Sequence, residues 1–552
     1  MPAGQYLLPE NPHLFLAAPP TTTTGELFGP PAYNFYDRPD GARVPTLGTP
    51  ALAGALAQSG YENITHKDLR FVNARDYLGE LSAADALLVT AITVNSGPAI
   101  ELARVYKKLN PNGVAIMGGP HATALPEQML EQGIDIVVRR EGDGIAKLIK
   151  ELQVSGTPEA IPGVSYRDGH GISETPDAAF LSCLRPDDPP LGPGVRGKER
   201  VELLRRMRQL PETLPHPIYP TEVQEKATVN MVTTSRGCPH DCDFCGVTNF
   251  YGGKYRRVSN GWVTDELGRI KQLNDERVRT GERPKSTFMA DDDFYDGTPI
   301  QKAQVMDLLE QATAEGLIPP MSLTQLRVDA AEDSKFLSAL EESNIGGVCL
   351  GIESVNDAAL AGANKGQDSK RIEACVRLYR KAGLWIHGMF ILGLDGDTRD
   401  TIRETVKWAK SNVHSAQFFA PVPLPGTRLT AEMESDDRVI SKEYSLYDGS
   451  HVLIEPENLT PSDLQAEIRR AHRSFYAARR LGPLSLITWD ALKPNYSHRN
   501  LGHKYMIDAA LRLAELFGRG GQSWDKVTNW YDQRLEEFKP GELIRLPKES
   551  IA

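Results

Sequence analysis

Three cysteines lie within eight residues near the middle of the chain, at Cys238, Cys242 and Cys245 in the segment SRGCPHDCDFCGV. Their spacing is C-x3-C-x2-C, and no fourth cysteine lies nearby. Three thiolates on one loop can bind three irons of a 4Fe–4S cluster and leave the fourth iron open to another ligand. We therefore predict a cluster that takes part in chemistry, since a fully cysteine-ligated cluster mainly carries electrons.

Other uses of these cysteines fit less well. A structural zinc site needs four ligands, and the candidate fourth ligand, His240, lies between two of the cysteines in the same loop. Disulfides are not expected in a chain of 552 residues with six cysteines and no secretory signal. Cys183, Cys349 and Cys375 stand alone in the sequence, and isolated cysteines are usually small buried hydrophobic residues.

The cysteine segment resembles the signature of the radical S-adenosylmethionine (SAM) enzymes. This resemblance implies that the open iron chelates the amino and carboxylate groups of SAM. The reduced cluster would then cleave SAM into methionine and a 5′-deoxyadenosyl radical. Phe244, the aromatic residue before the third cysteine, matches the family pattern and would lie near the adenine.

Residues 229 to 440 alternate between strand-like and helix-like patterns, which predicts a parallel sheet with helices on its outside. Six apolar segments are the expected strands: 229–235, 286–294, 321–329, 346–354, 385–394 and 416–425. Six β/α units predict a partial, TIM-like (β/α)6 barrel, open where an eightfold barrel would close.

Polar motifs follow these strands, at the end where barrel enzymes place their reactive groups. The acidic run Asp291, Asp292 and Asp293 follows the second strand and could bind the SAM ammonium group, or simply cap a helix. Arg327 follows the third strand and could neutralise the SAM carboxylate, or form a surface ion pair.

Two further strand ends resemble family segments. Glu353, in GIES, corresponds to a glutamate in a SAM-binding segment, and a charged residue directly after an apolar strand is rarely there for packing. Gly393, in GMFILGLDGDT, corresponds to a glycine-rich segment that passes over the adenosine, although a tight turn would also explain the glycine. The PLPGT run at 423–427 resembles the family's Pro-Gly-Thr turn after the sixth strand.

The first 165 residues show a second α/β pattern, which predicts a doubly wound, Rossmann-like domain. Its expected strands are 13–20, 85–93, 113–123 and 134–143, and its expected helices are 49–61 and 98–109. Ligands of such sheets bind beyond the carboxyl ends of the strands.

The segments MGGPHAT (117–123) and VVRREGD (137–143) resemble the cobalamin-binding domain that precedes the barrel in cobalamin-dependent radical SAM enzymes. The resemblance implies cobalamin contacts at eight positions: Thr93, Asn95, Ser96, Gly118, Gly119, His121, Glu141 and Gly142. A nucleotide, or no ligand, remains an alternative, although no G-x-G-x-x-G follows the first strand.

The chain departs from one cobalamin motif. Carriers that replace the lower base with histidine have D-x-H-x-x-G after the first strand, but no histidine occurs between His13 and His66. The D-x-H at Asp168 and His170 lacks the later glycine and is typical of a hairpin turn. We therefore expect cobalt without a histidine lower ligand.

The remaining regions are less specific. Residues 166–228 are rich in proline, glycine and charge, which predicts a linker, and residues 441–552 are expected to form a mostly helical domain that contacts substrate, with one helix at 461–482. A net charge of -11 argues against nucleic-acid partners. No apolar run reaches the ~20 residues of a transmembrane helix, and the N-terminus lacks a signal peptide, so we expect a cytoplasmic protein.

The resemblance implies a cobalamin-dependent methyltransferase. One SAM would methylate cob(I)alamin, and a second would give the radical that activates an unactivated carbon of a small molecule, such as a secondary metabolite, a lipid or a tetrapyrrole. A reductase such as flavodoxin or ferredoxin would supply electrons. Alternatives are a cyclisation, ring contraction or oxidation with the same cofactors, or a cluster- or cobalamin-binding protein without turnover. Catalytic residues beyond the cofactor ligands are not predicted.

Overall fold

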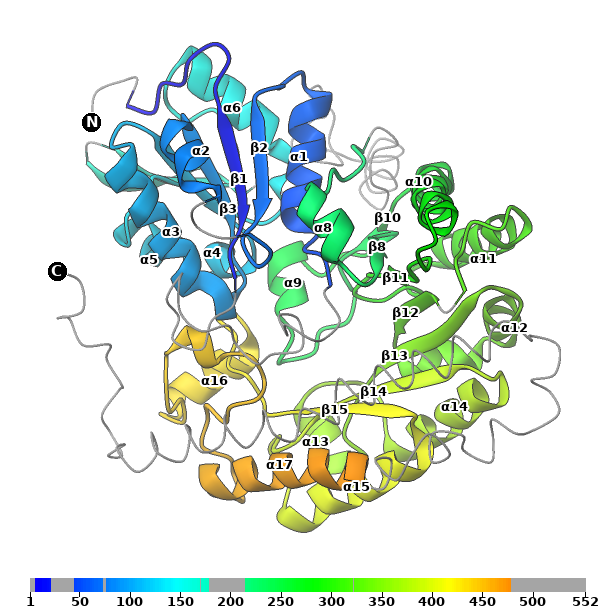
Figure 1. Ribbon diagram of the computed structural model, residues 1–552. Coiled ribbons are helices and arrows are strands. Elements are labelled where there is room, and N and C mark those ends of the chain that lie inside the picture. Colours follow the sequence, from blue (N-terminus) through cyan, green and yellow to red (C-terminus); the bar gives the residue numbers. More distant parts are fainter. Residues whose placement is uncertain are drawn as a thin grey trace, which may run out of the picture.

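The computed structural model describes residues 5–20, 44–72, 76–168, 170–177, 214–320 and 322–477. Two sheets with helices on their faces dominate it, and each belongs to a different part of the chain (Figure 1). The first sheet, drawn in blue and cyan, lies above the second, drawn in green and yellow. The expected division into two α/β units and a C-terminal helical part is confirmed.

The N-terminal sheet has seven strands in the order β2-β1-β3-β4-β5-β6-β7. Its parallel strands are β1 (Leu14–Ala18), β2 (Ile64–Asp68), β3 (Ala86–Thr90), β4 (Val114–Gly118) and β5 (Ile136–Val138). The sequence ITHKD of β2 has no apolar run, and only Asp68 in it is buried, so this edge strand was not predicted.

Alternate side chains of these strands enter two separate cores, as the period of a strand requires. Phe15 and Ala17 pack with α2 (Leu78–Ala83), α3 (Ser96–Leu109) and α5 (Pro126–Glu131) on one face. Leu14 and Leu16 pack with α1 (Gly48–Gln58) and α6 (Ile145–Val154) on the other. The sheet is therefore covered on both faces, as the doubly wound prediction required.

A hairpin extends this sheet beyond the predicted domain boundary. Strands β6 (Val164–Asp168) and β7 (Gly171–Glu174) add antiparallel to β5, so a boundary at residue 165 falls inside the hairpin. The Asp168 carboxylate accepts hydrogen bonds from the backbone N–H groups of His170 (2.6 Å) and Gly171 (2.9 Å). The expected turn at this D-x-H is confirmed.

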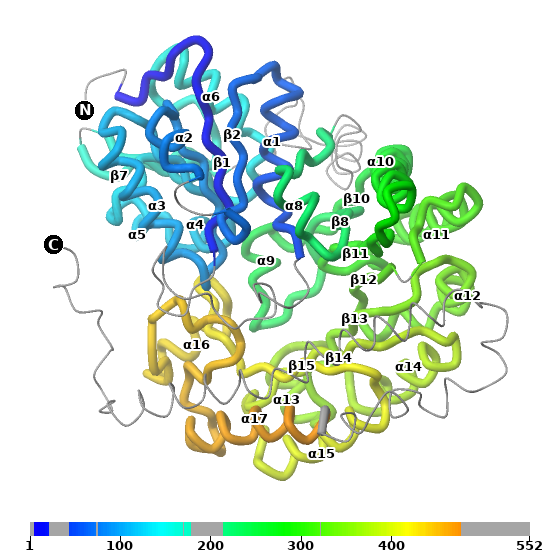
Figure 2. Tube along the Cα trace, viewed as in Figure 1, coloured from blue at the N-terminus to red at the C-terminus, as the bar shows by residue number. Residues whose placement is uncertain are grey.

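The second sheet contains all six predicted barrel strands, in the order β15-β14-β13-β12-β11-β8. They are β8 (Asn230–Val232), β11 (Thr287–Met289), β12 (Ser322–Leu326), β13 (Ile345–Glu353), β14 (Trp385–Ile391) and β15 (Ser415–Phe419). All neighbours are parallel, and β8 and β15 are the two edges. The barrel is thus partial, and the tube in Figure 2 shows it as an open crescent.

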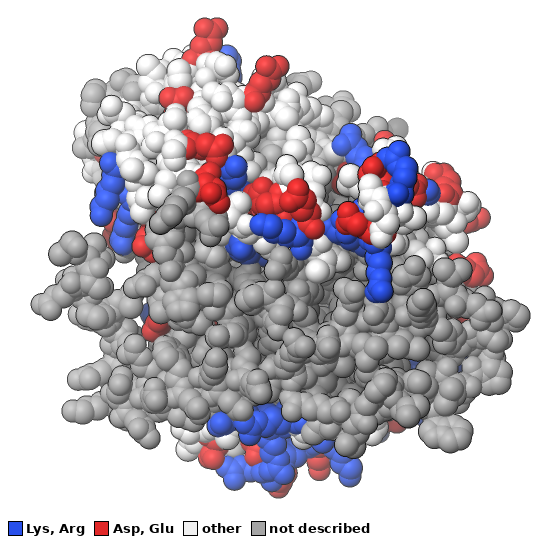
Figure 3. Space-filling model, viewed as in Figure 1, with Lys and Arg blue, Asp and Glu red and all other residues white. Residues whose placement is uncertain are grey.

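Helices cover the outside of the crescent and bury its core. They are α10 (Asn260–Arg279), α11 (Pro299–Ala314), α12 (Ser334–Glu342), α14 (Ser369–Lys381), α15 (Arg399–Asn412) and α17 (Pro461–Ala477). No helix in the described ranges is long and apolar enough to cross a membrane. On the face shown in Figure 3, the visible lysine and arginine side chains lie among aspartates and glutamates, so charges partly offset one another there.

The C-terminal part joins the two units. The short helix η6 (Tyr444–Leu446) lies against η2 (Thr93–Asn95) and α3 of the N-terminal domain, and α17 packs on β15 and α15 of the barrel. Residues 178–213 of the predicted linker and 478–552 of the predicted helical domain lie outside the described residues, as does Cys183.

Candidate functional site

The cysteine loop connects β9 (Ser235–Arg236) with α9 (Gly246–Tyr251). Strand β10 (Arg256–Arg257) returns antiparallel to β9, so a two-stranded ribbon closes the loop at its base. Gly237 has a φ of 81°, and a Cβ there would lie 2.2 Å from the carbonyl oxygen of Lys254. The backbone directly before Cys238 therefore requires glycine.

Cys245 lies close enough to Cys238 and to Cys242 to interact electrostatically with both. Burial raises the pKa of Cys238 to about 12 and that of Cys245 to about 11. Buried thiols of this kind stay protonated unless a cation compensates their negative charge, and the irons of a cluster do so. The donor set thus fits a cluster held by three cysteines, and the fourth ligand is left to another molecule.

A second donor set overlaps the first. Ligand atoms of Cys238, His240 and Asp296 all lie within 4.8 Å of one another, and His240 Nε2 is 2.5 Å from Asp296 Oδ2. These three residues could hold a single divalent ion, but Cys238 cannot serve it and the cluster together. The other described cysteines stand apart: Cys349 lies in β13 and Cys375 in α14, and burial raises the pKa of both thiols.

The acidic run after β11 separates into three roles. Asp291 accepts hydrogen bonds from the backbone and hydroxyl groups of Thr234 and Ser235, which fixes the strand end before the cysteine loop. Asp292 accepts a hydrogen bond from the N–H of Gly237 (3.0 Å), so it supports the loop itself. Asp293 is 2% exposed and accepts one described hydrogen bond, from the N–H of Tyr295 (3.3 Å).

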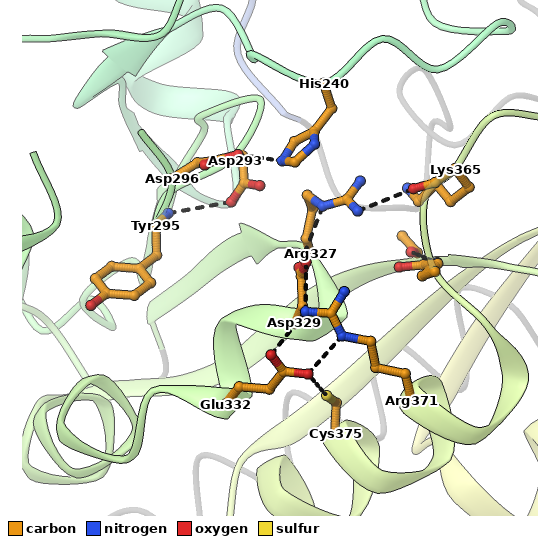
Figure 4. A network of polar contacts seen from close by, with 12 residues as sticks. His240, Asp293, Tyr295, Asp296, Arg327, Asp329, Glu332, Lys365, Arg371 and Cys375 are labelled. Carbon is orange, nitrogen blue, oxygen red and sulfur yellow. Dashed lines mark hydrogen bonds and ion pairs between the residues drawn. The ribbon is translucent and has the colours of Figure 1, made fainter. Parts of the chain in front are cut away.

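Asp293 and Arg327 both line a polar cavity of about 600 Å³ beside the cysteine loop (Figure 4). Burial, reinforced by Asp296, raises the pKa of Asp293 to about 8, because few groups there stabilise the carboxylate. Arg327 is 8% exposed; its Nη2 donates to the carbonyl of Lys365 (3.1 Å), and its Nε lies 3.4 Å from Asp329. A carboxyl group and a guanidinium group at one cavity suit the ammonium and carboxylate ends of an amino acid, respectively.

Glu353 has a buried partner, Lys365, that no sequence pattern predicted. Lys365 Nζ lies 2.8 Å from Glu353 Oε1 and 5.9 Å from the centre of the Phe244 ring, and it interacts with Cys242. Burial lowers the pKa of Lys365, but Glu353 and Cys242 outweigh it and raise the pKa above its usual value. Glu353 also has a φ of 62°, a strained conformation for a residue with a side chain.

The predicted adenosine residues have clear structural surroundings. Phe244 packs against Ala359, Ala363 and Leu394. Gly393 has a φ of 94°, and a Cβ there would lie 2.3 Å from Leu464 Cδ2 of α17. Neither residue lines the two cavities described here, so their contact with SAM stays a prediction.

A second cavity, of about 290 Å³, lies between the two units, at the lower end of the range for ligand pockets. The N-terminal domain contributes Gly118, Gly119, Glu141 and Gly142 from the ends of β4 and β5, and Ala51 from α1. The barrel contributes Met231, Ser235 and Asp292 beside the cysteine loop. The carboxyl ends of both sheets therefore face one space, and its described lining includes no histidine.

Four of the predicted cobalamin residues do not line this cavity. Asn95 accepts a hydrogen bond from the N–H of Ile92 (2.9 Å), and Ser96 donates one to the carbonyl of Thr93 (2.8 Å), so both stabilise the turn after β3. His121 is buried against Tyr444, with ring centres 4.6 Å apart, and burial lowers its pKa to about 4. Helix η6, which contains Tyr444, therefore covers the edge of the N-terminal domain at η2.

Gly119 has a structural reason to be glycine. Its φ is 98°, and a Cβ would lie 2.6 Å from the carbonyl oxygen of Ala91. The turn needs glycine whether or not a ligand binds. Contact with cobalamin remains a prediction for all eight positions.

Two family models match the chain. That of the Radical SAM superfamily matches residues 232–409, and that of the B12 binding domain matches residues 39–150. The first range contains the cysteine loop and most of the partial barrel, and the second contains β2 to β5.

Relatives over most of the chain agree. An uncharacterized methyltransferase of Pyrococcus horikoshii is 27% identical over 495 residues, which cover 88% of this chain and 96% of that protein. An anaerobic magnesium-protoporphyrin IX monomethyl ester cyclase of Cereibacter sphaeroides is 26% identical over 448 residues (78% and 66%). The hopanoid C-3 methylase of Methylococcus capsulatus is 24% identical over 443 residues (79% and 77%).

Solved structures share the fold. The radical SAM methyltransferase TsrM from Kitasatospora setae, with tryptophan and a SAM analogue bound, has a TM-score of 0.59 and 16% identity, covering 93% of this chain and 99% of that one. OxsB, a cobalamin-dependent radical SAM enzyme with aqua-cobalamin and SAM bound, has a TM-score of 0.61 and 12% identity (97% and 82%). The chain therefore contains a radical SAM domain and a B12-binding domain, and these domains imply a 4Fe–4S cluster, SAM and cobalamin as cofactors.

Proposed function

We propose that this enzyme transfers a methyl group to an unactivated carbon of a small molecule. The observation that carries the proposal is the cavity between the units, which is lined by strand ends of the B12-binding domain and by residues beside the cysteine loop. Cofactors bound at the two strand-end faces would share this space. A relative named as a methyltransferase and another named as a methylase support methyl transfer as the outcome.

The protein's own residues would hold and orient the cofactors. When bound, the cluster and SAM supply a carbon radical, and cobalamin supplies a transferable methyl group. Cys238, Cys242 and Cys245 would hold the cluster, while Asp293 and Arg327 would bind the ammonium and carboxylate of SAM. The buried Lys365–Glu353 pair lies beside Cys242 of the loop, where it would help to exclude water.

A mass measurement tests this proposal. The reconstituted protein is incubated without oxygen with SAM, a chemical reductant and candidate substrates, among them secondary-metabolite scaffolds, lipids and tetrapyrroles. Methyl transfer adds one methylene unit to the product, and SAM carrying a deuterated methyl group passes that label on. Formation of 5′-deoxyadenosine with a product of unchanged carbon count would contradict methylation.

A ring-forming or oxidative reaction is the second candidate, because a relative named as a cyclase covers 78% of the chain. It would give a product two or more hydrogens lighter, with no label from the methyl group. For the electron supply we propose a flavodoxin or ferredoxin in the cytoplasm, and reduction of the cluster by such a protein in place of the chemical reductant tests it.

A further inference from the structure

Two ion pairs, one with a fully buried arginine, fasten the cysteine loop to the B12-binding domain. Arg236 of β9 lies 2.6 Å from Asp143 Oδ2, and Arg256 of β10 donates from Nη1 to Glu141 Oε2 at 2.9 Å. A second hydrogen bond joins Arg256 Nη2 to Glu141 Oε1. The two arginines belong to the ribbon that closes the cysteine loop, and the two acids belong to the turn after β5.

These pairs are largely removed from solvent. The Arg256 side chain is 0% exposed and that of Glu141 is 11% exposed. A buried guanidinium needs an acid to offset its lost hydration, and a two-pronged contact also fixes its orientation. The contact therefore constrains the distance and the angle between the two segments.

The same turn reaches the far end of the cysteine loop. Arg140, directly before Glu141, donates from Nη1 to the carbonyl of Asn249 (2.9 Å) in α9, which follows Cys245. Arg140 has a φ of 65°, so its backbone is held in a strained conformation. The segment 140–143 thus contacts the cysteine loop on both sides.

The contact also forms a wall of the cavity between the units. Arg140, Glu141, Asp143 and Arg236 all line it. A movement at this contact would change the cavity and the cysteine loop together.

We propose that Arg236 and Arg256 are positioning residues. Through their ion pairs with Asp143 and Glu141, they hold the cluster loop at a fixed place relative to the B12-binding domain. Glu141 then acts on the barrel, and not mainly as a cofactor ligand. This assignment concerns the placement of the two cofactors and does not rest on methyl transfer being the outcome.

Hydrogen–deuterium exchange of the full-length, cofactor-free protein tests the proposal. Asp143→Asn and Glu141→Gln should speed amide exchange in residues 236–251 by about tenfold or more, the range expected for lost charge-assisted hydrogen bonds. Exchange in β13 and β14 should not change. Asp275→Asn, which removes the exposed pair of Asp275 with Lys271 (2.7 Å), is the matched control and should leave the loop as it is.

Neutralising an acid alone strands a buried arginine and could unfold the region. The double variant Glu141→Gln, Arg256→Met removes the pair without that charge and should also loosen residues 236–251. In protein loaded with both cofactors, these variants should show a wider distribution of the magnetic coupling between Co(II) and the reduced cluster, because the distance between the two centres would vary more. Wild-type exchange in the loop of all the variants, or an equal rise in β13 and β14, would overturn the proposal.

Discussion

At the scale of single residues, the site is marked by charged groups that are buried beside the cysteine loop. An ion in a protein interior needs a partner, and most of these groups have one. Glu353 pairs with Lys365, and Asp291 accepts four hydrogen bonds. Asp293 is less well compensated, which makes it the acid best suited to receive a cation from outside.

We expect Cys242→Ala to lose most of its iron and all SAM cleavage, because two thiolates cannot keep the open iron in place. Iron content and 5′-deoxyadenosine formation measure this after anaerobic reconstitution. Cys375→Ala, in α14, is the control and should retain both. Wild-type cleavage in Cys242→Ala would remove the cluster assignment.

Asp293→Asn should weaken SAM binding by about tenfold or more, because asparagine cannot ionise to offer the SAM ammonium a charged acceptor. Iron content should remain near that of the wild type, since Asp293 has no described bond to the cysteine loop. Equilibrium binding of SAM to the reconstituted protein checks this. Asp292→Ala should instead lower iron content, because it removes the side chain that accepts the N–H of Gly237. Equal SAM affinity in wild type and Asp293→Asn would leave Asp293 without a binding role.

His387 should make the protein less stable in acid. Burial lowers its pKa to about 4, below the ordinary value of 6.5. The unfolded chain therefore binds the proton more tightly, and stability is lost as pH falls from 6.5 towards 4, by about 1–3 kcal/mol. His387→Gln should reduce the slope of melting temperature against pH in this window. An unchanged slope would mean that His387 binds its proton as readily in the folded protein as in the unfolded chain.

At the scale of elements, glycines decide how loops pass close to their neighbours. Gly393 lets the loop after β14 pack against Leu464 of α17, which is fully buried. The contact ties the segment predicted to cover the adenosine to the C-terminal helix.

Gly393→Ala should destabilise the protein by about 2–3 kcal/mol, since the new Cβ would be strained at positive φ and would meet Leu464. Gly60→Ala is the matched control, because Gly60 has a similar φ of 88° and nothing within 4 Å of the added Cβ. Thermal unfolding of both variants separates the cost of backbone strain from that of the contact. Similar losses in both would show that α17 yields without cost.

At the scale of the whole molecule, two sheets turn their carboxyl ends towards one cavity, and the cysteine loop lies at its edge. The absence of histidine from the described lining has a measurable consequence for the cobalt.

Bound Co(II) should lack a histidine nitrogen as its lower ligand, so its paramagnetic resonance spectrum should show no strong nitrogen splitting. Ala51→Trp, on the α1 wall of the cavity, should lower cobalamin content while sparing the cluster. This position tests the cavity better than Gly119, whose turn any side chain would strain. A histidine-ligated signal would contradict the expected cobalt environment, and wild-type cobalamin content in Ala51→Trp would place the corrin elsewhere.

The sequence by itself determined the elements and their order, together with the cysteine loop. Six barrel strands and the doubly wound domain follow from local hydrophobic periodicity, and the proposed cluster ligands from three neighbouring cysteines, so each signal lies within a short segment. The edge strand β2 was not predicted, because its sequence is largely polar. Only the tertiary structure showed that Lys365 pairs with Glu353, that Asp293 differs from Asp292, and that Glu141 meets Arg256, 115 residues away. Such pairings depend on how separate segments pack, and no spacing along the chain encodes them.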